Sequence, residues 1–208
     1  GDIEVMNDLE SLKIDYTVHN DNWILINKLT KERYELNDSG TIEVEGGNDK
    51  FYLMKREFGS SMSLYEVYEQ SGPANGYDRY MVLDPEILYT GGVGSGEESI
   101  YIDGKGAVID LQEGTGIWIS GDVNNNMTGS LTIDRCTIVN GGSYGISLSG
   151  YSTNSITNCN IINDHWGIQV SDNINVVIRD CNFIDNMYGV AIVGTETNVH
   201  LSYCNGWN

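Results

Sequence analysis

The sequence predicts an all-β chain whose second half winds into a solenoid of short stacked strands, and three observations predict it. Four cysteines recur at intervals of 23, 22 and 23 residues: Cys136, Cys159, Cys181 and Cys204. Three pairs of an aromatic residue and a glycine keep the same period: Tyr144 with Gly145, Trp166 with Gly167, and Tyr188 with Gly189. Apolar residues alternate with others after each glycine, a pattern typical of short half-buried strands. Units of about 22 residues are too short for helix pairs or propeller blades, so each forms one coil of two or three strands.

The same pattern places an earlier coil before the first cysteine. Apolar alternation runs from Ile100 to Asp110 and returns after Gly116. If Gly116 is equivalent to Gly145, then Ala107 occupies the position of the cysteines, where a small buried residue fits. The solenoid is therefore predicted to span residues 97–208.

The cysteine column has two interpretations, a pair of disulfides or a stack of reduced thiols. Equivalent residues of a parallel solenoid stack about 4.8 Å apart. Their Cβ atoms keep nearly that separation, beyond the ~3.8 Å usual in disulfides. We therefore prefer a buried, reduced structural ladder of Cys136, Cys159, Cys181 and Cys204. The cysteines lack CxxC spacing and a nearby set of histidines, so zinc is not favoured.

Composition agrees with many turns and excludes several classes of partner. The 25 glycines and 22 asparagines make up more than a fifth of the chain, which disfavours long helices and favours tight turns. Acidic residues number 30 against 11 basic ones, a formal net charge of −19, so nucleic acids and anionic membranes would be repelled. Gly, Ser, Thr and Asn interrupt the longest uncharged stretch, Cys136 to Asn163, so no membrane span is predicted.

These residues also resemble a known family. The run from Tyr101 to Asp110 resembles the opening coil of right-handed parallel β-helix proteins of the pectin-lyase-like superfamily. The units around Cys136, Cys159 and Cys181 resemble the parallel β-helix repeats of secreted and cell-surface proteins. The resemblance implies a right-handed parallel β-helix over about residues 97–208, in an extracellular or cell-surface protein. It implies no single activity, because the superfamily includes lyases, hydrolases, epimerases, adhesins and phage tailspikes.

Residues 1–96 lack the repeat and are predicted to form a β-rich region that caps the solenoid or folds as a small domain. Three hairpins are predicted there: residues 23–26 with 33–36, 41–44 with 51–54, and 64–68 with 80–83. The glycine-rich run Gly91–Gly96 is expected to join the two regions. A cap is expected because an open coil exposes apolar side chains and unpaired strand edges.

The aromatic residues before the repeated glycines, Tyr144, Trp166 and Tyr188, are predicted to form one strip along the solenoid. One ring per coil would give an extended platform against which sugar rings pack. The alternative is a packing column that shields the turn before each glycine. Polysaccharide is therefore a candidate partner, with these three side chains as the ligand-binding residues.

Carboxylates matter most for enzymes of this fold, and the sequence offers one candidate pair. Asp164 and Asp185 come from adjacent coils at nearly the same position, with His165 beside them, so an acid–base pair is geometrically feasible. The alternative places Asp185 with Asn140 and Asn163 in a column that hydrogen-bonds between coil turns. The catalytic motifs for pectin-type reactions are not recognisable. Facing their acidic substrate would require cations, and residues 97–208 offer few: Lys105, Arg135 and Arg179.

No cofactor is predicted, and Ca²⁺ is the one ion that the acidic composition leaves open. Neither an EF-hand loop nor a Gly-Asp nonapeptide repeat occurs in the sequence. The segment Asp122–Asn126 is the best local candidate for calcium, and a solvated loop is the alternative.

The sequence therefore favours an extracellular or cell-surface structural or adhesive module over an enzyme. Nothing near Asn208 resembles a cap: either further coils follow in a longer protein, or a partner covers the open end. In the second case we expect self-association, head to tail, into fibres. The alternative is a carbohydrate-active or carbohydrate-binding β-helix, such as a glycoside hydrolase, a lyase or a tailspike-like protein.

Overall fold

The computed structural model describes residues 2–4, 11–17, 23–27, 33–36, 39–45, 50–55, 60–125 and 127–207. The chain divides into two compact units, Gly1–Glu57 and Phe58–Asn208. The boundary expected between residues 96 and 97 thus falls inside the second unit.

The first unit contains two antiparallel sheets. One has the order β1-β6-β3-β4 and consists of β1 (Asp2–Glu4), β3 (Trp23–Asn27), β4 (Arg33–Leu36) and β6 (Lys50–Lys55). The other pairs β2 (Ser11–Thr17) with β5 (Ser39–Glu45). Leu25 and Leu36 are buried in this unit.

Two of the predicted hairpins fall in this unit. Pairing of β3 with β4 confirms the hairpin of residues 23–26 with 33–36. The hairpin of residues 41–44 with 51–54 is wrong, because β5 pairs with β2, while β6 pairs with β1 and β3. The register sets Leu12 opposite Val44 and Ile14 opposite Ile42. The turn signal at residues 46–49 lies outside the described residues.

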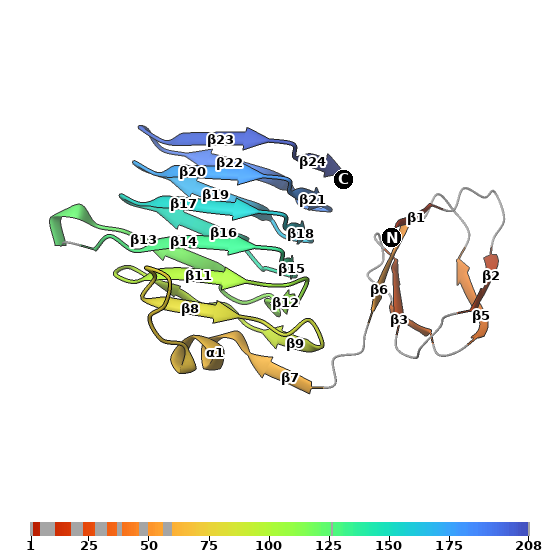
Figure 1. The fold of residues 1–208 in the computed structure, drawn as a ribbon. Helices are drawn as coiled ribbons and strands as arrows, with labels where there is room; N and C mark the ends of the chain where they lie inside the picture. Colours follow the sequence, from red (N-terminus) through yellow and green to blue (C-terminus); the bar gives the residue numbers. More distant parts are fainter. Residues whose placement is uncertain are drawn as a thin grey trace. The chain divides into compact units, whose positions relative to one another are not determined.

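The second unit is a right-handed parallel β-solenoid of about six turns, in which three sheets run along the stack (Figure 1). The first sheet contains β8 (Arg79–Val82), β11 (Ser99–Asp103), β14 (Ser130–Asp134), β17 (Thr153–Thr157), β20 (Asn175–Arg179) and β23 (Asn198–Ser202). The second sheet contains β7 (Ser60–Ser63), β9 (Ile87–Thr90), β12 (Val108–Asp110), β15 (Thr137–Val139), β18 (Asn160–Ile162), β21 (Asn182–Ile184) and β24 (Asn205–Trp207). The third sheet contains β10 (Gly94–Ser95), β13 (Ile117–Ser120), β16 (Tyr144–Ser149), β19 (Trp166–Ser171) and β22 (Tyr188–Val193). The predicted fold class is confirmed.

Apolar side chains stack inward in columns. In the first sheet Ile102, Ile133, Ile156 and Ile178 pair in succession, and all four are fully buried. Burying an aliphatic side chain of this size stabilises the fold by roughly 1.5–3 kcal/mol. The apolar repeat of the sequence is therefore the repeat of the core.

Single residues in left-handed backbone turn the chain from one sheet to the next. Between the second and third sheets these are Asn140, Asn163 and Asp185, with φ of 60°, 62° and 54°. Between the first and second sheets they are Arg135, Asn158, Asp180 and Tyr203. Asn and Asp tolerate this conformation better than most residues, which explains why Asn140, Asn158 and Asn163 occur at these turns.

A column of glycines runs along the start of the third sheet, where two members precede β10 and β13 and three are the second residues of β16, β19 and β22. Strand register aligns its five members: Gly92, Gly116, Gly145, Gly167 and Gly189. A Cβ atom at Gly92 would lie 2.1 Å from the carbonyl oxygen of Thr115, and one at Gly116 would lie 2.3 Å from that of Tyr144. Successive coils approach too closely here for any side chain.

The amino-terminal end of the solenoid is covered by a helix, α1 (Leu64–Gln70), beside β7 and β8 (Figure 1). Leu64 and Tyr68 are buried in the main apolar cluster, and Val67 packs against it. The predicted hairpin of residues 64–68 with 80–83 is wrong: these three residues recur at helical spacing, and β8 pairs in parallel with β11.

The coils begin earlier than predicted. β8, β9 and β10 form a first turn whose strands pair with β11, β12 and β13. The run Gly91–Gly96 is not a joint, because it contains β10 and Gly92 of the glycine column. This turn lacks a cysteine and an aromatic–glycine pair, so the repeat signal was too weak to reveal it.

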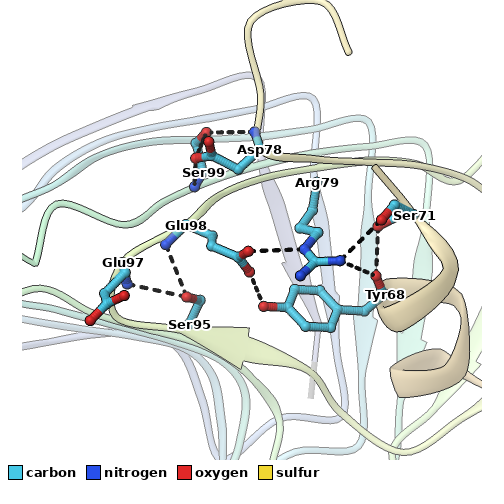
Figure 2. Close-up of polar contacts among 8 residues, drawn as sticks. All are labelled: Tyr68, Ser71, Asp78, Arg79, Ser95, Glu97, Glu98 and Ser99. Carbon is cyan, nitrogen blue, oxygen red and sulfur yellow. Dashed lines mark hydrogen bonds and ion pairs between the residues drawn. The ribbon is translucent and has the colours of Figure 1, made fainter. Parts of the chain in front are cut away.

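A polar cluster fastens α1 to the first turn (Figure 2). Arg79 forms an ion pair with Glu98 at 3.0 Å and donates to the carbonyl oxygens of Tyr68 and Ser71 at 3.3 and 3.0 Å. Its guanidinium group lies 4.6 Å from the centroid of the Tyr68 ring, and the Tyr68 hydroxyl donates to Glu98. Burial, followed by this hydrogen bond, raises the pKa of Tyr68. The cluster thus joins α1 to the first residue of β8 and to the residue that precedes β11.

Candidate functional site

The four cysteines lie at one position of successive coils, just before the strands of the second sheet. All four are free thiols: Cys136, Cys159 and Cys181 are buried, and Cys204 is partly buried. The Sγ atoms of Cys159 and Cys181 donate to carbonyl oxygens two residues earlier, at 3.0 and 3.2 Å. Hydrogen bonding between neighbouring thiols raises the pKa of Cys159 and of Cys181, and burial raises that of Cys204. Ala107 precedes the equivalent strand β12.

Because thiolate is the reactive form, we expect these cysteines to resist alkylation in the folded protein. In native buffer at pH 8, a thiol-specific reagent should label Cys204 slowly and the other three far more slowly. All four should react at once in guanidinium chloride. Mass spectrometry counts the labelled residues. If the intact mass of the unlabelled protein increased on treatment with a reductant by the hydrogens of two reduced disulfides, the column of thiols would be contradicted.

Asp164 lies inside the solenoid. Only 4% of its surface is exposed, and its Oδ1 accepts a hydrogen bond from the backbone N–H of Gly141 at 2.5 Å. Its Oδ2 is buried and has no hydrogen-bond partner among the described residues. Burial raises the pKa of Asp164 to about 8 from its ordinary value of 3.8, although the Gly141 N–H opposes the shift.

Asp185, the second carboxyl of the candidate pair, and the neighbouring His165 lie in different surroundings. Asp185 occupies the left-handed turn of the next coil and is partly buried. His165 is exposed, and its ring contacts those of Trp166 and Tyr188, with centroids 5.1 and 5.8 Å away. The structure thus places Asp164 in the interior and His165 outside it.

Side-chain amides form columns between the coils. Asn163 donates to Asn140 at 2.9 Å, and Asn140 donates to Asp110 at 3.1 Å. A second column runs along the second sheet, where Asn182 donates to Asn160 at 2.8 Å and Asn205 donates to Asn182 at 3.3 Å. Asn163 and Asn140 therefore hydrogen-bond between coils, as the alternative interpretation of this position expects.

The aromatic strip is in register on the third sheet, where Tyr144 pairs with Trp166 and Trp166 with Tyr188. Exposure differs along the strip: Tyr188 is 53% exposed, whereas Tyr144 and Trp166 are partly buried. The His165 ring contacts the two upper members of the strip. The three residues thus lie on one face of one sheet, with Tyr188 the most accessible.

In the calcium candidate, Asp122–Asn126, the described residues form a small turn that hydrogen bonds to the Asp122 carboxylate hold together. Asp122 accepts hydrogen bonds from the backbone N–H of Asn124 at 2.9 Å and the side-chain amide of Asn125 at 2.6 Å. These hydrogen bonds, the Asn125 amide first, lower the pKa of Asp122. Asn126 lies outside the described residues. Within the described ranges, no three His, Cys, Asp or Glu side chains are grouped to hold a metal ion.

Sequence reasoning missed a hollow of about 500 Å³ on the side of the solenoid where the third sheet leads into the first. Seven uncharged residues line it: Thr128, Ser130, Tyr151, Ser152, Thr153, Asn173 and Asn175. The signal that would have found it is a recurrence of Ser, Thr and Asn just before equivalent strands of three successive coils.

Comparison with known proteins agrees with this architecture. A family model described as "right handed beta helix region" matches residues 91–208. No curated protein and no solved structure gives a significant match. None of the described helices is long and apolar enough to cross a membrane. The family match covers more than half of the chain, and its range consists of stacked parallel coils; the chain belongs to the right-handed β-helix family.

Proposed function

We propose that the chain is a non-enzymatic structural and adhesive module of an extracellular or cell-surface protein. The observation that carries the proposal is the burial of Asp164, one of the two carboxylates that an acid–base pair would require. With 4% of its surface exposed, it cannot reach a polysaccharide outside the solenoid. A pair made with Asp185 would therefore lack one member at the surface.

The polar columns support the same proposal. Hydrogen-bonded amides join successive coils on the second sheet and at the turn that follows it. In a solenoid each coil contacts only its neighbours, so such bonds add stiffness along the axis. A stiff, acidic rod suits a spacer or scaffold, and its charge of −19 would repel acidic polysaccharides.

Self-association belongs to the proposal. β22, β23 and β24 stand at the ends of their sheets, and several of their apolar side chains are exposed: Ile192, Val193, Leu201 and Trp207. A second copy of this chain packed against this edge would cover these side chains.

Turnover on a polysaccharide array tests the proposal. We expect neither the wild type nor the Asp185→Asn variant to release reducing ends or unsaturated products. Release by the wild type that Asp185→Asn abolishes would show an enzyme. In sedimentation velocity of this chain we expect reversible self-association, and a strict monomer at high concentration removes it from the proposal.

Carbohydrate binding along the aromatic strip is the second candidate. It is favoured by the register of Tyr144, Trp166 and Tyr188 on adjacent strands, since aromatic faces pack well against sugar rings. Binding that Tyr188→Ala weakens, without turnover, would support it.

A further inference from the structure

We propose that Asn75 is a site of spontaneous deamidation, at which the backbone nitrogen of Gly76 displaces ammonia from the side-chain amide. The sequence contains three Asn-Gly pairs: Asn75 with Gly76, Asn140 with Gly141, and Asn205 with Gly206. Asparagine before glycine is prone to this reaction, because glycine has no Cβ to hinder the close approach of its backbone. The proposal goes beyond the structural role, and it rests on how differently the fold treats the three pairs.

The reaction needs only water as a co-reactant. The Gly76 nitrogen loses its proton to solvent and bonds to Cγ of Asn75, and the Cγ–Nδ2 bond breaks as the side-chain nitrogen takes up a proton and leaves as ammonia. The product is a cyclic imide, which water then opens. Opening between Cγ and the ring nitrogen gives aspartate, whereas opening at the main-chain carbonyl gives isoaspartate, in which the chain continues through the side chain.

Asn75 and Gly76 are the two central residues of a tight hairpin turn. Both have left-handed backbone, with φ of 52° and 86°, and Ala74 and Tyr77 exchange two backbone hydrogen bonds of 3.1 and 3.0 Å across them, the pattern of a type I′ turn. Both central residues are exposed. In the part of the chain that the structure describes, no hydrogen bond engages the Asn75 side chain or the Gly76 N–H. The amide and the attacking nitrogen are therefore both available.

The space around the turn permits ring closure. A Cβ atom at Gly76 would have no heavy atom within 4 Å, so no neighbour obstructs the rotation that brings Cγ of Asn75 to the Gly76 nitrogen. This rotation breaks the hydrogen bonds of the turn. An exposed turn opens at lower cost than a strand inside a sheet, so the reactive conformation is accessible in the folded protein.

The fold blocks the same reaction at Asn140. The backbone N–H of Gly141 donates to the buried Asp164 at 2.5 Å, so the nitrogen that would attack is engaged. The Asn140 side chain donates to Asp110 at 3.1 Å and accepts from Asn163 at 2.9 Å. Ring closure at Asn140 would have to break all three hydrogen bonds.

Asn205 is held by strand pairing. It lies in β24, where its backbone N–H donates to the carbonyl oxygen of Cys181 at 3.0 Å and its side-chain amide donates to Asn182 at 3.3 Å. Ring closure requires the chain to leave the extended conformation, and pairing with β21 resists that change. We therefore expect Asn205 to react more slowly than Asn75, although both are exposed.

The residues that follow the turn are anchored to the solenoid, so the reaction stays local. The Tyr77 hydroxyl donates to Thr132 at 3.1 Å, and Asp78 accepts from the Ser99 hydroxyl at 2.6 Å (Figure 2). Deamidation adds a carboxylate at the amino-terminal end of the solenoid, and isoaspartate also lengthens the main chain. The expected product is a folded solenoid with an altered turn and a more negative charge.

Incubation of the folded protein at pH 8, followed by peptide mapping with mass spectrometry, tests the proposal. We expect Asn75 to convert first, to aspartate and isoaspartate peptides of equal mass that chromatography separates. Asn140 and Asn205 should convert at least tenfold more slowly. In guanidinium chloride the three pairs should react at similar rates, because the fold no longer distinguishes them.

Two variants sharpen the test. Gly76→Ala should slow conversion of Asn75 at least tenfold, because the added methyl group hinders the attacking nitrogen. Gly206→Ala is the matched control: it makes the same change in another exposed Asn-Gly pair, where a Cβ also has no heavy atom within 4 Å. It should leave the rate at Asn75 unchanged.

Three results would overturn the proposal: no conversion of Asn75 in the folded protein over a time in which the unfolded chain reacts, conversion of Asn140 or Asn205 as fast as Asn75, or an unchanged rate at Asn75 in Gly76→Ala. The wild type alone decides the first two, so the test does not depend on the folding of a variant. None of these results concerns turnover or self-association, so the proposal fails or stands separately from the structural role.

Discussion

Replacing Gly116 by alanine is expected to destabilise the solenoid by about 3 kcal/mol or more, the upper range for overpacking in a rigid interior. The added Cβ would lie 2.3 Å from the carbonyl oxygen of Tyr144 and 2.5 Å from that of Gly145. Both oxygens belong to the backbone at the start of β16, which pairs with β13 along its length. Relief would require the two coils to separate, and that would disrupt hydrogen bonds of the sheet.

Gly72→Ala is the matched control for this prediction. A Cβ at Gly72 has no heavy atom within 4 Å, and both substitutions reduce the freedom of the unfolded chain equally. Urea unfolding of both variants gives the difference directly, with Gly72→Ala expected to be neutral or slightly stabilising. Similar free energies of unfolding for the two variants would mean that the glycine column is not a steric requirement.

Replacing Asp164 by asparagine is expected to stabilise the protein strongly at neutral and alkaline pH. Asn186, one coil above, shows what an amide does at this position: its Oδ1 accepts from the backbone N–H of Asp164 at 2.9 Å, and its Nδ2 donates to the carbonyl oxygen of Ile161 at 2.8 Å. Asp164 makes the first of these bonds with Gly141, but an ionised carboxylate has no proton for the second. The carbonyl equivalent to that of Ile161 belongs to Ile138, its partner in the second sheet.

The pH dependence follows from the raised pKa of Asp164. The folded protein holds this proton up to about pH 8, whereas the unfolded chain releases it near the ordinary value of 3.8. Between these limits the folded state binds more protons, so its stability falls as pH rises, by roughly 1.4 kcal/mol per pH unit. Above about pH 8 the loss is complete, and the advantage of Asp164→Asn reaches a plateau of the order of 5 kcal/mol.

The measurement is the difference in free energy of unfolding between wild type and Asp164→Asn from pH 4 to pH 9, which cancels the titration of the other acidic groups. Asp172→Asn is the control, because it makes the same chemical change at an exposed, left-handed position. Its effect should stay within about 0.5 kcal/mol. A difference for Asp164→Asn that does not grow with pH would show that the buried carboxyl is not held in its neutral form.

Local repetition made the solenoid predictable from the sequence. Cys159 and Gly167 recur because each coil repeats the same backbone path, so their spacing alone gives the length of the coil. The helix that contains Leu64 and Tyr68 could not be predicted from the repeat, because it occurs only once. Its apolar residues also suit a short strand. The first turn was missed for a related reason: Ile87 occupies the position equivalent to Ala107, where later coils also have a small residue.

The candidate sites depended on details that periodicity does not contain. Asp164 and Asp185 are one position apart in the repeat, and this single step places one carboxyl inside the core and the other in a turn. The hollow at Tyr151 arises where segments from three coils meet, and no one of them is unusual alone. Stacking predicts which residues are neighbours, but the orientation of a side chain at a bend depends on the backbone there.

The long connection between β13 and β14 also shows where this architecture accepts new sequence. Nine residues span a corner that three residues cross one coil later, yet the strands on both sides keep their register. The bend of Asn140 shows a smaller change of the same kind, because four residues join β15 to β16 and three join β18 to β19, with the strand register kept. The larger change in chain length, and with it any grafted peptide or fused domain, belongs at the corner of residues 121–129.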